Sequence, residues 1–497
     1  MAITKEAYQA LQSIVGPEWV SDDPAICEAD CHCEAVGILF GELPVPPACS
    51  IQPGNAEEVR EIVRLANRYR MPYIATSTFY SFTSSPSLDN SILMDLKRMT
   101  KLEIDDQNLY AIVEPGVSYS MLQAEAFKRG LFTFTPGSGA QCSVLANTVN
   151  AGDGPFGWRH GTEGYRRILG VEWVLPDGEL VRLGSRATSK DFFWGEGPGP
   201  DLRGLLRPHL SGGMGVVTRM AVKLFPFIPE RLEPAGLGPQ ATLKLPEKRL
   251  KWWNVSYPSP EKAVELLREL GRCEIGLIAM TVPSLFTGIA AARRKGSTEP
   301  KKAEAAAPAQ ETRARILLFG CTSEKHMEYE ERVLLDIVAE TGGSARPGRP
   351  SDFSWFMAAD SISVAASEGV FASMVAVESI DHALKVAKMT DEIKRKYTPP
   401  LPPTVGSLAW YVAYELGHTC KMESIIPGTI EDMHHLGALI KECIAEFIKV
   451  GACPDFLDPG ICGPVCYNFH EKLRMFKKAF DPNGVSNPPQ PLGTAGL

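Results

Sequence analysis

The sequence lacks the features of a membrane-anchored or secreted protein. None of its apolar runs approaches the length of about 20 residues that spans a bilayer. The start, MAITKEAYQALQSIVG, has neither the basic end nor the long apolar core of a secretory signal. An excess of basic residues is missing as well, because the formal charge is −8 and the pI is about 5.7. These absences predict a cytoplasmic protein with no membrane span and no nucleic-acid partner.

Cys-X-X-Cys pairs are also absent, although the chain has 12 cysteines. The densest groups are Cys27, Cys31 and Cys33 near the start, and Cys453, Cys462 and Cys466 near the end. Zinc and iron–sulfur sites are usually built from Cys-X-X-Cys pairs, and neither group has that spacing. A chain of this length needs no disulfides to hold its core. We therefore predict free thiols in a mostly reduced protein, and no metal site.

The composition is that of a globular protein with a sizeable core, with 44% hydrophobic and 22% charged residues. From about residue 50 to residue 227, helical and strand patterns mix. Asn55 is placed to cap an amphipathic helix, residues 119–130 predict a second helix, and a Pro-Asp-Gly turn at 176–178 joins two strands. This mixture predicts an α+β fold.

Beyond residue 227 the composition changes twice. A Pro-rich passage at 228–248 indicates a domain boundary. Residues 290–315 are rich in Ala, Lys, Glu and Pro and nearly devoid of large apolar side chains, which predicts a solvated insertion. A second α+β unit resumes after it. The chain then ends in a helix stopped by Asp-Pro-Asn-Gly at 481–484, followed by an irregular tail.

The segment from Asn147 to Gly161, NTVNAGDGPFGWRHG, holds four glycines and a proline. A buried strand would carry fewer glycines, and a surface loop would carry more charge. Glycine lets another group approach the backbone closely, and clustered backbone N–H groups bind anions such as phosphates. We therefore expect a ligand to lie against this segment.

Five segments, in the order of the chain, make the sequence recognisable: QPGNAEEVREIVRLANRYRMPY, LMDLKRMTKLEIDDQNLYAIVEPGVSYSMLQ, GVEWVLPDGELVRLG, GGMGVVTRMAVKLFP and FDPNGVSNP. Together they resemble the vanillyl-alcohol oxidase and p-cresol methylhydroxylase (PCMH-type) flavoprotein family, which is related to the FAD subunits of glycolate and D-lactate dehydrogenases. The resemblance covers most of residues 40–227 and the end of the chain, and it is weak between them.

The resemblance implies FAD as the cofactor and a PCMH-type two-part architecture with an α+β cap. The FAD-binding domain would be residues 1–227. A cap or substrate domain would be residues 228–450, with a flexible insertion near 290–315. A C-terminal segment, 451–497, would return to the first domain.

The family pattern also implies which residues hold FAD. Asn147, Thr148 and Asn150 are expected to form hydrogen bonds with flavin heteroatoms. Trp158 and His160 are expected to pack against the ribityl or adenine end of FAD. The remaining expected contacts are Ser77, Thr78, Phe79, Tyr80, Ser81, Pro136, Gly137, Ser138, Gly152, Gly157, Gly215, Val216 and Val217.

The sequence departs from the family pattern in the loop after the predicted strand that begins with MPY at 71–73. The family's phosphate loop is glycine-rich there, whereas residues 76–87, TSTFYSFTSSPS, hold no glycine. Hydroxyl groups of Ser77 and Thr78 can replace part of the hydrogen bonding, but a bulky residue forced to positive φ would be strained. The double glycine expected before NTVN is Leu145-Ala146.

The residues at the positions of the family's catalytic groups depart further from the family pattern. Phenol-oxidising relatives carry an acid near the flavin where this chain has Asn150. They also carry a Tyr-Arg pair that clamps a phenolate, where this chain has VGACPDFLDPG at 450–460. An amide takes no proton and the clamp is missing, so simple para-substituted phenols are poor candidates as substrates.

The resemblance points instead to a strand, WYVAYELGHTCKMES at 410–424, where His418 aligns with a histidine placed above the flavin. Such a histidine suits proton abstraction from a substrate hydroxyl; a satisfied core histidine is the alternative. Strand alternation would put Tyr411 and Glu415 on one face, and Tyr414 and His418 on the other. The candidate catalytic residues are His418, Tyr411, Glu415 and, from the C-terminal segment, Tyr467.

These features predict an FAD-dependent dehydrogenase that oxidises an alcohol or a hydroxylated carbon by hydride transfer to flavin N5. One alternative is a 2-hydroxy-acid dehydrogenase of the glycolate/D-lactate type, with Lys421 as the candidate for binding a carboxylate. Another is a flavin-binding or degenerate subunit with an assembly or electron-relay role. The expected partners are a small-molecule substrate, an electron-acceptor protein or partner subunit, and further copies of the chain in a homo-oligomer.

Overall fold

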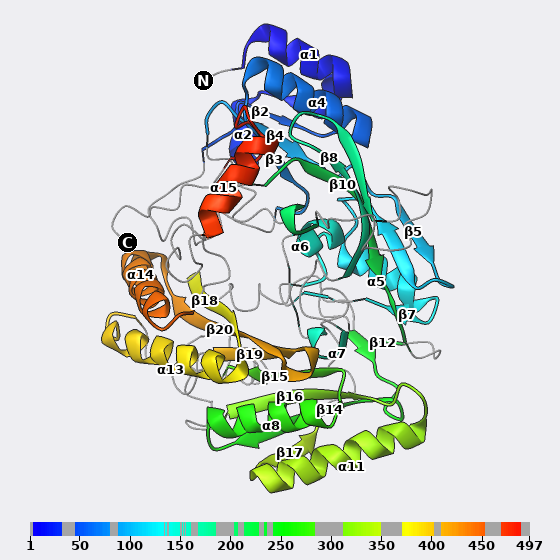
Figure 1. Cartoon of the computed structure of the whole chain (residues 1–497), viewed down its shortest axis with the longest axis vertical. Coiled ribbons are helices and arrows are strands. Elements are labelled where there is room, and N and C mark those ends of the chain that lie inside the picture. Colours follow the sequence, from blue (N-terminus) through cyan, green and yellow to red (C-terminus); the bar gives the residue numbers. More distant parts are fainter. Residues whose placement is uncertain are drawn as a thin grey trace.

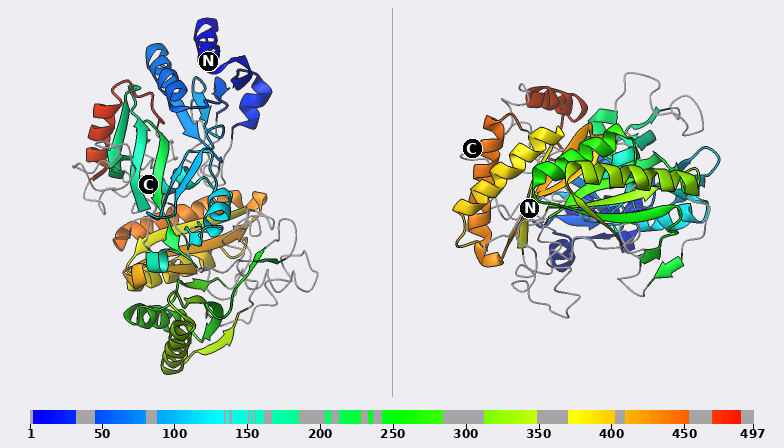
Figure 2. Two further views of the ribbon diagram at one scale, coloured as in Figure 1. Left: turned by 90° about the vertical axis from the view of Figure 1, so that its right-hand side faces the viewer. Right: turned by 90° about the horizontal axis from the view of Figure 1, so that it is seen from below.

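The computed structural model describes residues 3–31, 45–79, 88–133, 135–136, 139–149, 152, 154, 156–160, 167–184, 203–206, 213–227, 233–235, 242–283, 312–348, 370–401, 409–452 and 469–488. Three β-sheets follow one another along the long axis of the molecule (Figure 1). A four-stranded sheet lies at one end, a five-stranded sheet in the middle, and a seven-stranded sheet with its helices at the other end (Figures 1 and 2).

The four-stranded sheet comes from the start of the chain. In spatial order its strands are β1 (Val20–Ser21), β2 (Cys49–Ile51), β4 (Ile92–Asp95) and β3 (Tyr73–Thr76), with β2, β4 and β3 parallel. Its helices are α1 (Lys5–Val15), α2 (Pro24–Ala29) and α4 (Ala56–Tyr69). The predicted cap is confirmed, because the Asn55 side chain accepts a hydrogen bond from the Glu58 N–H. The apolar face of α4 is buried against this sheet.

The five-stranded sheet is antiparallel throughout. In spatial order its strands are β5 (Leu102–Asp105), β6 (Tyr110–Val113), β10 (Val216–Lys223), β8 (Ile168–Val174) and β9 (Leu180–Gly184). The predicted hairpin is confirmed as β8–β9, with Gly178 at φ +87° in its turn. The helices of this region are α5 (Tyr119–Phe127), α6 (Val144–Val149) and α7 (Gly157–His160).

The seven-stranded sheet is also antiparallel. In spatial order its strands are β17 (Ser344–Pro347), β14 (Leu250–Tyr257), β16 (Thr312–Phe319), β15 (Ile278–Val282), β19 (Ala409–Tyr414), β20 (Thr419–Gly428) and β18 (Val370–Glu378). Its helices are α8 (Pro260–Arg272), α11 (Glu324–Thr341), α13 (Ile380–Lys396) and α14 (Met433–Lys449). They cover one face of the sheet. The other face packs on the five-stranded sheet through a second core cluster.

Smaller elements connect these layers. They are η1 (Pro17–Trp19), η5 (Arg203–Leu206), η8 (Glu415–Gly417), η9 (Ile430–Asp432), the pair β7 (Leu131–Phe132) with β11 (Phe225–Pro226), and the pair β12 (Glu233–Ala235) with β13 (Thr242–Lys244). Across the described ranges, no helix is long and apolar enough to cross a membrane.

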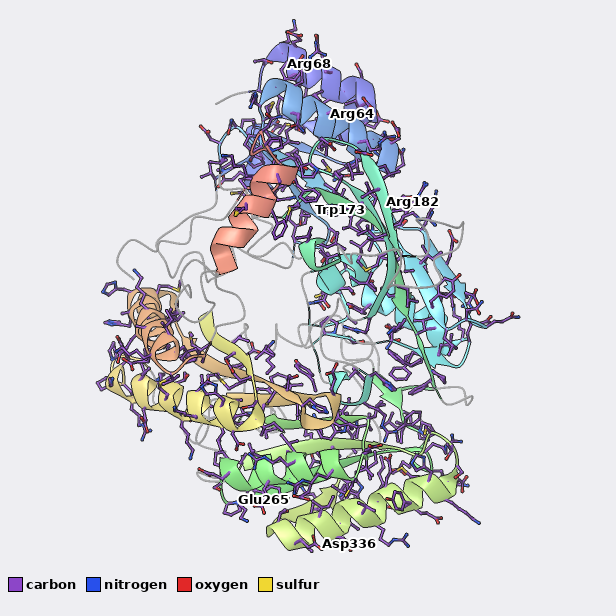
Figure 3. All side chains as sticks on the ribbon, in the orientation of Figure 1. Arg64, Arg68, Trp173, Arg182, Glu265 and Asp336 are labelled. Atoms are coloured by element: carbon purple, nitrogen blue, oxygen red, sulfur yellow. The ribbon has the colours of Figure 1, made fainter. Side chains whose placement is uncertain are left out.

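The end of the chain returns to the first two sheets. In α15 (Phe469–Phe480), Phe480 stacks on Trp173 of β8, with ring centroids 6.2 Å apart. Figure 3 shows Trp173 inside the molecule, close to α15. Further on, Asn487 contacts both sheets. Its side-chain oxygen accepts from the Ala75 N–H of β3 at 3.0 Å, and its amide nitrogen donates to the Gly215 carbonyl beside β10 at 2.9 Å. The C-terminal segment therefore ties the two sheets together.

Two expectations about local structure need correction. Residues 312–315, placed by composition in a solvated insertion, begin strand β16, where Thr312 and Ala314 are buried. The rest of 290–315 lies outside the described residues. The segment 410–424 is not one strand but the hairpin β19–β20, because Glu415, Leu416 and Gly417 all adopt positive φ and turn the chain.

Candidate cofactor and substrate site

The loop after β3 is the predicted phosphate loop, and it is strained where glycine is missing. Phe79 has φ +53°, a left-handed conformation that costs a bulky residue roughly 1–2 kcal/mol. Its ring lies under the Lys97 ammonium at 5.4 Å, and Lys97 pairs with Asp95 at 2.8 Å. The strain expected from the glycine-free sequence is therefore present at Phe79.

Several buried hydroxyl groups lack a hydrogen-bond partner within the described part of the chain. Among them are Ser77 Oγ after β3 and Thr135 Oγ1 beside Pro136. An orphaned buried hydroxyl costs roughly 1–3 kcal/mol, so such groups are usually satisfied by a ligand or water. Ser77 was expected to contact FAD; Thr135 was not, because a lone threonine carries no sequence signal. These hydroxyls suit the phosphate and ribityl oxygens of FAD.

Helix α6 presents Asn147 and Thr148 to the same region. The Tyr119 hydroxyl lies 3.1 Å from Asn147 Oδ1 and 3.3 Å from Thr148 Oγ1, so a fully buried tyrosine holds both side chains in place. Burial raises the pKa of Tyr119, which keeps the hydroxyl protonated. The hydrogen bond from Tyr119 to Asn147 Oδ1 fixes the orientation of the amide group, so the direction of the Asn147 side-chain nitrogen is fixed as well.

The glycines of the loop are crowded by the protein itself. A Cβ on Gly152 would stand 2.0 Å from the Asn147 side chain, and one on Gly157 would stand 2.4 Å from the ring of Tyr414. Glycine is thus required at Gly157 because the tyrosine of β19 packs there. This gives the glycine pattern a physical reason that the sequence did not reveal.

Trp158 and His160, which follow in α7, point into the protein. Trp158 is fully buried in the core of the seven-stranded sheet, and its indole N–H donates to the Ile275 carbonyl at 2.8 Å. The expected stacking of Trp158 on FAD is therefore corrected. His160 stacks on Phe225 with ring centroids 4.2 Å apart, and burial lowers its pKa to about 4. His160 is neutral at pH 7.

The backbone of Gly215, Val216 and Val217 is also engaged by the protein. The Gly215 N–H donates to Ser486 Oγ at 2.7 Å, and its carbonyl accepts from Asn487. Val216 and Val217 pair with β8 in the sheet. These contacts give the three residues a structural role in joining the C-terminal segment to β10.

The candidate catalytic residues do not converge. Tyr411 is buried on the helix-covered face of the sheet, and burial raises its pKa well above the ordinary value. Glu415 lies in η8, whose turn packs on α8 and α13, and His418 is exposed just after it. The expected alternation fails because the chain turns at Glu415. Tyr467 lies outside the described residues, as do Tyr80, Ser81, Gly137, Ser138 and Asn150.

A different polar pair lies on the sheet face that packs on the five-stranded sheet. In the hairpin register Val412 is opposite Lys421 and Trp410 is opposite Glu423, and opposed residues share a face. Val412 belongs to the core cluster shared with the five-stranded sheet, so Lys421 and Glu423 lie on that face. Lys421 Nζ and Glu423 Oε2 are 3.3 Å apart, with side chains 16% and 21% exposed. The alternation of side chains along β19 and β20 therefore places Lys421 and Glu423 on the same face as Val412.

No cluster of three or more His, Cys, Asp or Glu side chains suited to a metal ion occurs within the described ranges. Of the dense cysteine groups, Cys27 is buried and Cys31 is half-buried. Cys33, Cys453, Cys462 and Cys466 lie outside the described residues.

Comparison with known families decides the cofactor. Residues 47–184 match the FAD binding domain family. The first part of this chain is an FAD-binding domain. The match includes Ser77, Thr135, Asn147 and Thr148, and the predicted cofactor, FAD, is confirmed at the level of this domain.

Curated relatives share parts of the chain. The protein is 31% identical over 233 residues to 1'-carboxy-chondrochloren decarboxylase of Chondromyces crocatus, covering 45% of this chain and 40% of that one. It is 31% identical to D-lactate dehydrogenase of Archaeoglobus fulgidus, covering 35% and 38%. It is 30% identical to glycolate oxidase subunit GlcD of Bacillus subtilis, covering 45% and 46%. The aligned part spans under half the length of each of these relatives.

Solved structures share the whole fold. The protein superposes on p-cresol methylhydroxylase with substrate bound at a TM-score of 0.78 and 18% identity, covering 99% of this chain and 98% of that one. On 4-ethylphenol oxidase from Gulosibacter chungangensis the TM-score is 0.75 at 20% identity, covering 98% and 97%. The predicted α+β fold of the PCMH type is therefore confirmed.

Proposed function

We propose that this protein is an FAD-dependent dehydrogenase that oxidises an alcohol or another hydroxylated carbon. Support comes from the FAD-binding domain at 47–184 and from the polar pair Lys421–Glu423 on the sheet face that packs against the first domain. When bound, FAD supplies the acceptor for the hydride that leaves the substrate carbon. Ser77, Thr78, Thr135, Asn147 and Thr148 are the described residues that would hold it.

Lys421 and Glu423 are the residues that we assign to substrate. They lie on one face at neighbouring same-face positions of β20, so one molecule can contact both. The Lys421 ammonium would bind an anionic group of the substrate, and the Glu423 carboxylate would take up the proton of the reacting hydroxyl. Val412, opposite Lys421, belongs to the apolar cluster on this face, so the pair is only partly exposed to water.

Lys421 favours one substrate class, the 2-hydroxy acids. A partly buried ammonium is suited to binding a carboxylate, and the chain matches parts of a D-lactate dehydrogenase and of glycolate oxidase subunit GlcD. We therefore give the 2-hydroxy-acid reaction as the second candidate function. If neither an alcohol nor a 2-hydroxy acid reduces the flavin, the remaining proposal is a flavin-binding subunit without dehydrogenase activity.

Electrons leave reduced flavin through an acceptor that we place in a partner protein or subunit. The chain is 28% identical over 197 residues to the flavoprotein subunit of 4-cresol dehydrogenase from Pseudomonas putida, whose name indicates a multi-subunit enzyme. A cytoplasmic location and a homo-oligomer remain predictions. Size-exclusion chromatography with light scattering tests the oligomer.

The first experiment asks whether flavin is present and how it is attached. The visible spectrum of the purified protein is recorded before and after acid precipitation. We expect a flavin spectrum, and its distribution between supernatant and pellet reports covalency. A colourless protein that stays flavin-free after incubation with excess FAD would contradict the proposal.

The second experiment separates the substrate classes. Flavin-loaded protein is mixed anaerobically with D-lactate and with propane-1,2-diol, which differ in the carboxylate, and flavin bleaching is followed. If Lys421 binds a carboxylate, Lys421→Met should weaken apparent D-lactate binding about 10- to 100-fold, as expected for loss of a charged hydrogen bond. Bleaching by the diol should change little.

Lys251 provides a matched control. It pairs with Glu331 of α11 on the helix-covered face of the same sheet, and both side chains are 27% exposed. Lys251→Met therefore removes a lysine–glutamate pair from the sheet without touching the proposed substrate face. Equal effects of the two substitutions on D-lactate bleaching would rule out the role of Lys421.

A further inference from the structure

A cysteine, a histidine and a glutamate line up at the junction of β16 and α11, far from the FAD-binding residues in the chain. Cys321 is exposed, and its Sγ lies 3.5 Å from His326 Nδ1. The other ring nitrogen, His326 Nε2, lies 3.6 Å from Glu330 Oε1. The imidazole thus stands between the thiol and a carboxylate.

The carboxylate is fixed. Glu330 is fully buried, and it accepts the Phe319 N–H at 2.9 Å and the Arg159 guanidinium at 2.8 Å. His326 is one turn before it on α11, so helical spacing holds the imidazole against it. A buried negative charge beside one ring nitrogen stabilises the imidazolium that forms when the other nitrogen takes a proton.

Other charged groups also lie near Cys321. Arg249 donates to the Cys321 carbonyl at 2.8 Å, which places a guanidinium next to the residue. Cys321 also lies two residues before Ser323, the N-cap of the 18-residue helix α11, whose N-terminus carries partial positive charge. Glu324 opposes these effects, but it pairs with Lys248 at 3.3 Å.

We propose that Cys321 is a reactive thiol that forms mixed disulfides with small disulfide molecules, with His326 as its base and Glu330 as the group that orients His326. His326 takes the thiol proton, and the thiolate attacks one sulfur of the disulfide R–S–S–R. The Cys321–S–R bond forms as the R–S–S–R bond breaks. The departing thiolate takes the proton from the imidazolium and leaves as R–SH.

The other described cysteines provide the contrast. Cys27, Cys49, Cys142, Cys420 and Cys443 are buried, and Cys31 is half-buried. Burial raises the pKa of the Cys420 and Cys443 thiols, to about 12 for Cys443. Cys273 is exposed like Cys321, and it caps the C-terminus of α8, where its N–H donates to the Glu269 carbonyl. It is therefore the exposed cysteine against which the rate of Cys321 is compared.

The test is a limited reaction of the whole flavin-loaded protein with iodoacetamide at pH 6 to 9, followed by mass spectrometry of the peptides. An ordinary cysteine is only a few per cent thiolate at pH 7. We expect Cys321 to be modified about 10-fold faster than Cys273 at pH 7, with a smaller loss of rate toward pH 6. Oxidised glutathione should add one glutathione, and the adduct should map to Cys321.

Two histidine substitutions complete the design. His326→Gln should lower the Cys321 rate to that of Cys273. His382→Gln removes a histidine that also faces a glutamate one turn away, Glu378 at 3.2 Å, and it should leave the Cys321 rate unchanged. Equal rates and equal pH profiles for Cys321 and Cys273 in the unsubstituted protein would overturn the proposal, even if His326→Gln fails to fold.

Discussion

The ring of Tyr414 fills the space that a side chain at position 157 would occupy. A Cβ built on Gly157 would stand 2.4 Å from Tyr414 Cδ1, and both residues are buried. Gly157 begins α7 within the glycine-rich segment 147–161, and Tyr414 ends β19 in the seven-stranded sheet. The contact therefore couples this segment to the seven-stranded sheet.

Gly157→Ala should destabilise the protein by about 1–3 kcal/mol, because the added methyl group overpacks a buried contact. Thermal unfolding of the purified variant measures this. Tyr414→Ala opens the space, so the double variant should be more stable than the sum of the two single effects indicates. Additive effects would show that the two residues do not meet.

Gly152→Val should lower flavin content while the protein stays folded. The larger side chain would displace the Asn147 side chain, whose oxygen accepts from Tyr119. The ratio of flavin to protein absorbance measures the effect. Adding Asn147→Ala relieves the clash and should restore the melting temperature but not the flavin content. Full flavin content in Gly152→Val would place the cofactor elsewhere.

His160 should make stability fall on mild acidification. Burial, followed by the charge of Arg159, lowers the pKa of His160 from 6.5 to about 4. The unfolded chain therefore binds a proton first, so stability is full above pH 6.5 and is lost as the pH falls toward 4. Between pH 7 and pH 5 the loss is about 2 kcal/mol.

His160→Phe keeps an aromatic ring against Phe225 and removes the titration. Urea unfolding of both proteins at pH 7 and pH 5 isolates the histidine, because all other acid-sensitive groups are shared. The variant should lose less stability than the parent over this range. An equal loss would mean that His160 is not held neutral by the fold.

His418→Ala should slow flavin reduction by less than 10-fold. Loss of a general base typically costs about 100- to 10,000-fold, but His418 is exposed on a turn that packs on the helix-covered side of the sheet. Stopped-flow reduction by substrate, with a melting curve on the same preparation, checks this. A slowing in the general-base range with an intact flavin spectrum would restore His418 as the base.

Local signals in the sequence predicted several elements of the fold correctly. The Asn55 cap, the Pro-Asp-Gly hairpin and the stop after Phe480 each depend on residues adjacent in the chain, and the structure confirms them. Family resemblance supplied the cofactor. The domain boundaries at 227/228 and 450/451 stay predictions.

The site was harder to predict because the positions of its side chains depend on contacts with residues that are distant in the sequence. Trp158 has an aromatic side chain suited to a cofactor, yet its hydrogen bond goes to Ile275, 117 residues away. The sequence predicts that His418 lies in a strand. Glu415 and Leu416 adopt positive φ in the structure, but neither is a residue type that favours this conformation. Thr135 gave no signal at all. Tertiary packing decides each case.

The clamp made by Asn487 sets an order of events during protein synthesis. Ala75 and Asn487 are 412 residues apart, so this contact can form only after the residues between them have been synthesised. At typical elongation rates the delay is roughly 20–80 s. The seven-stranded sheet uses strands between 250 and 428 and can close earlier. The parallel strands β2, β4 and β3 are therefore made early but lack the Asn487 contact until after the seven-stranded sheet can close.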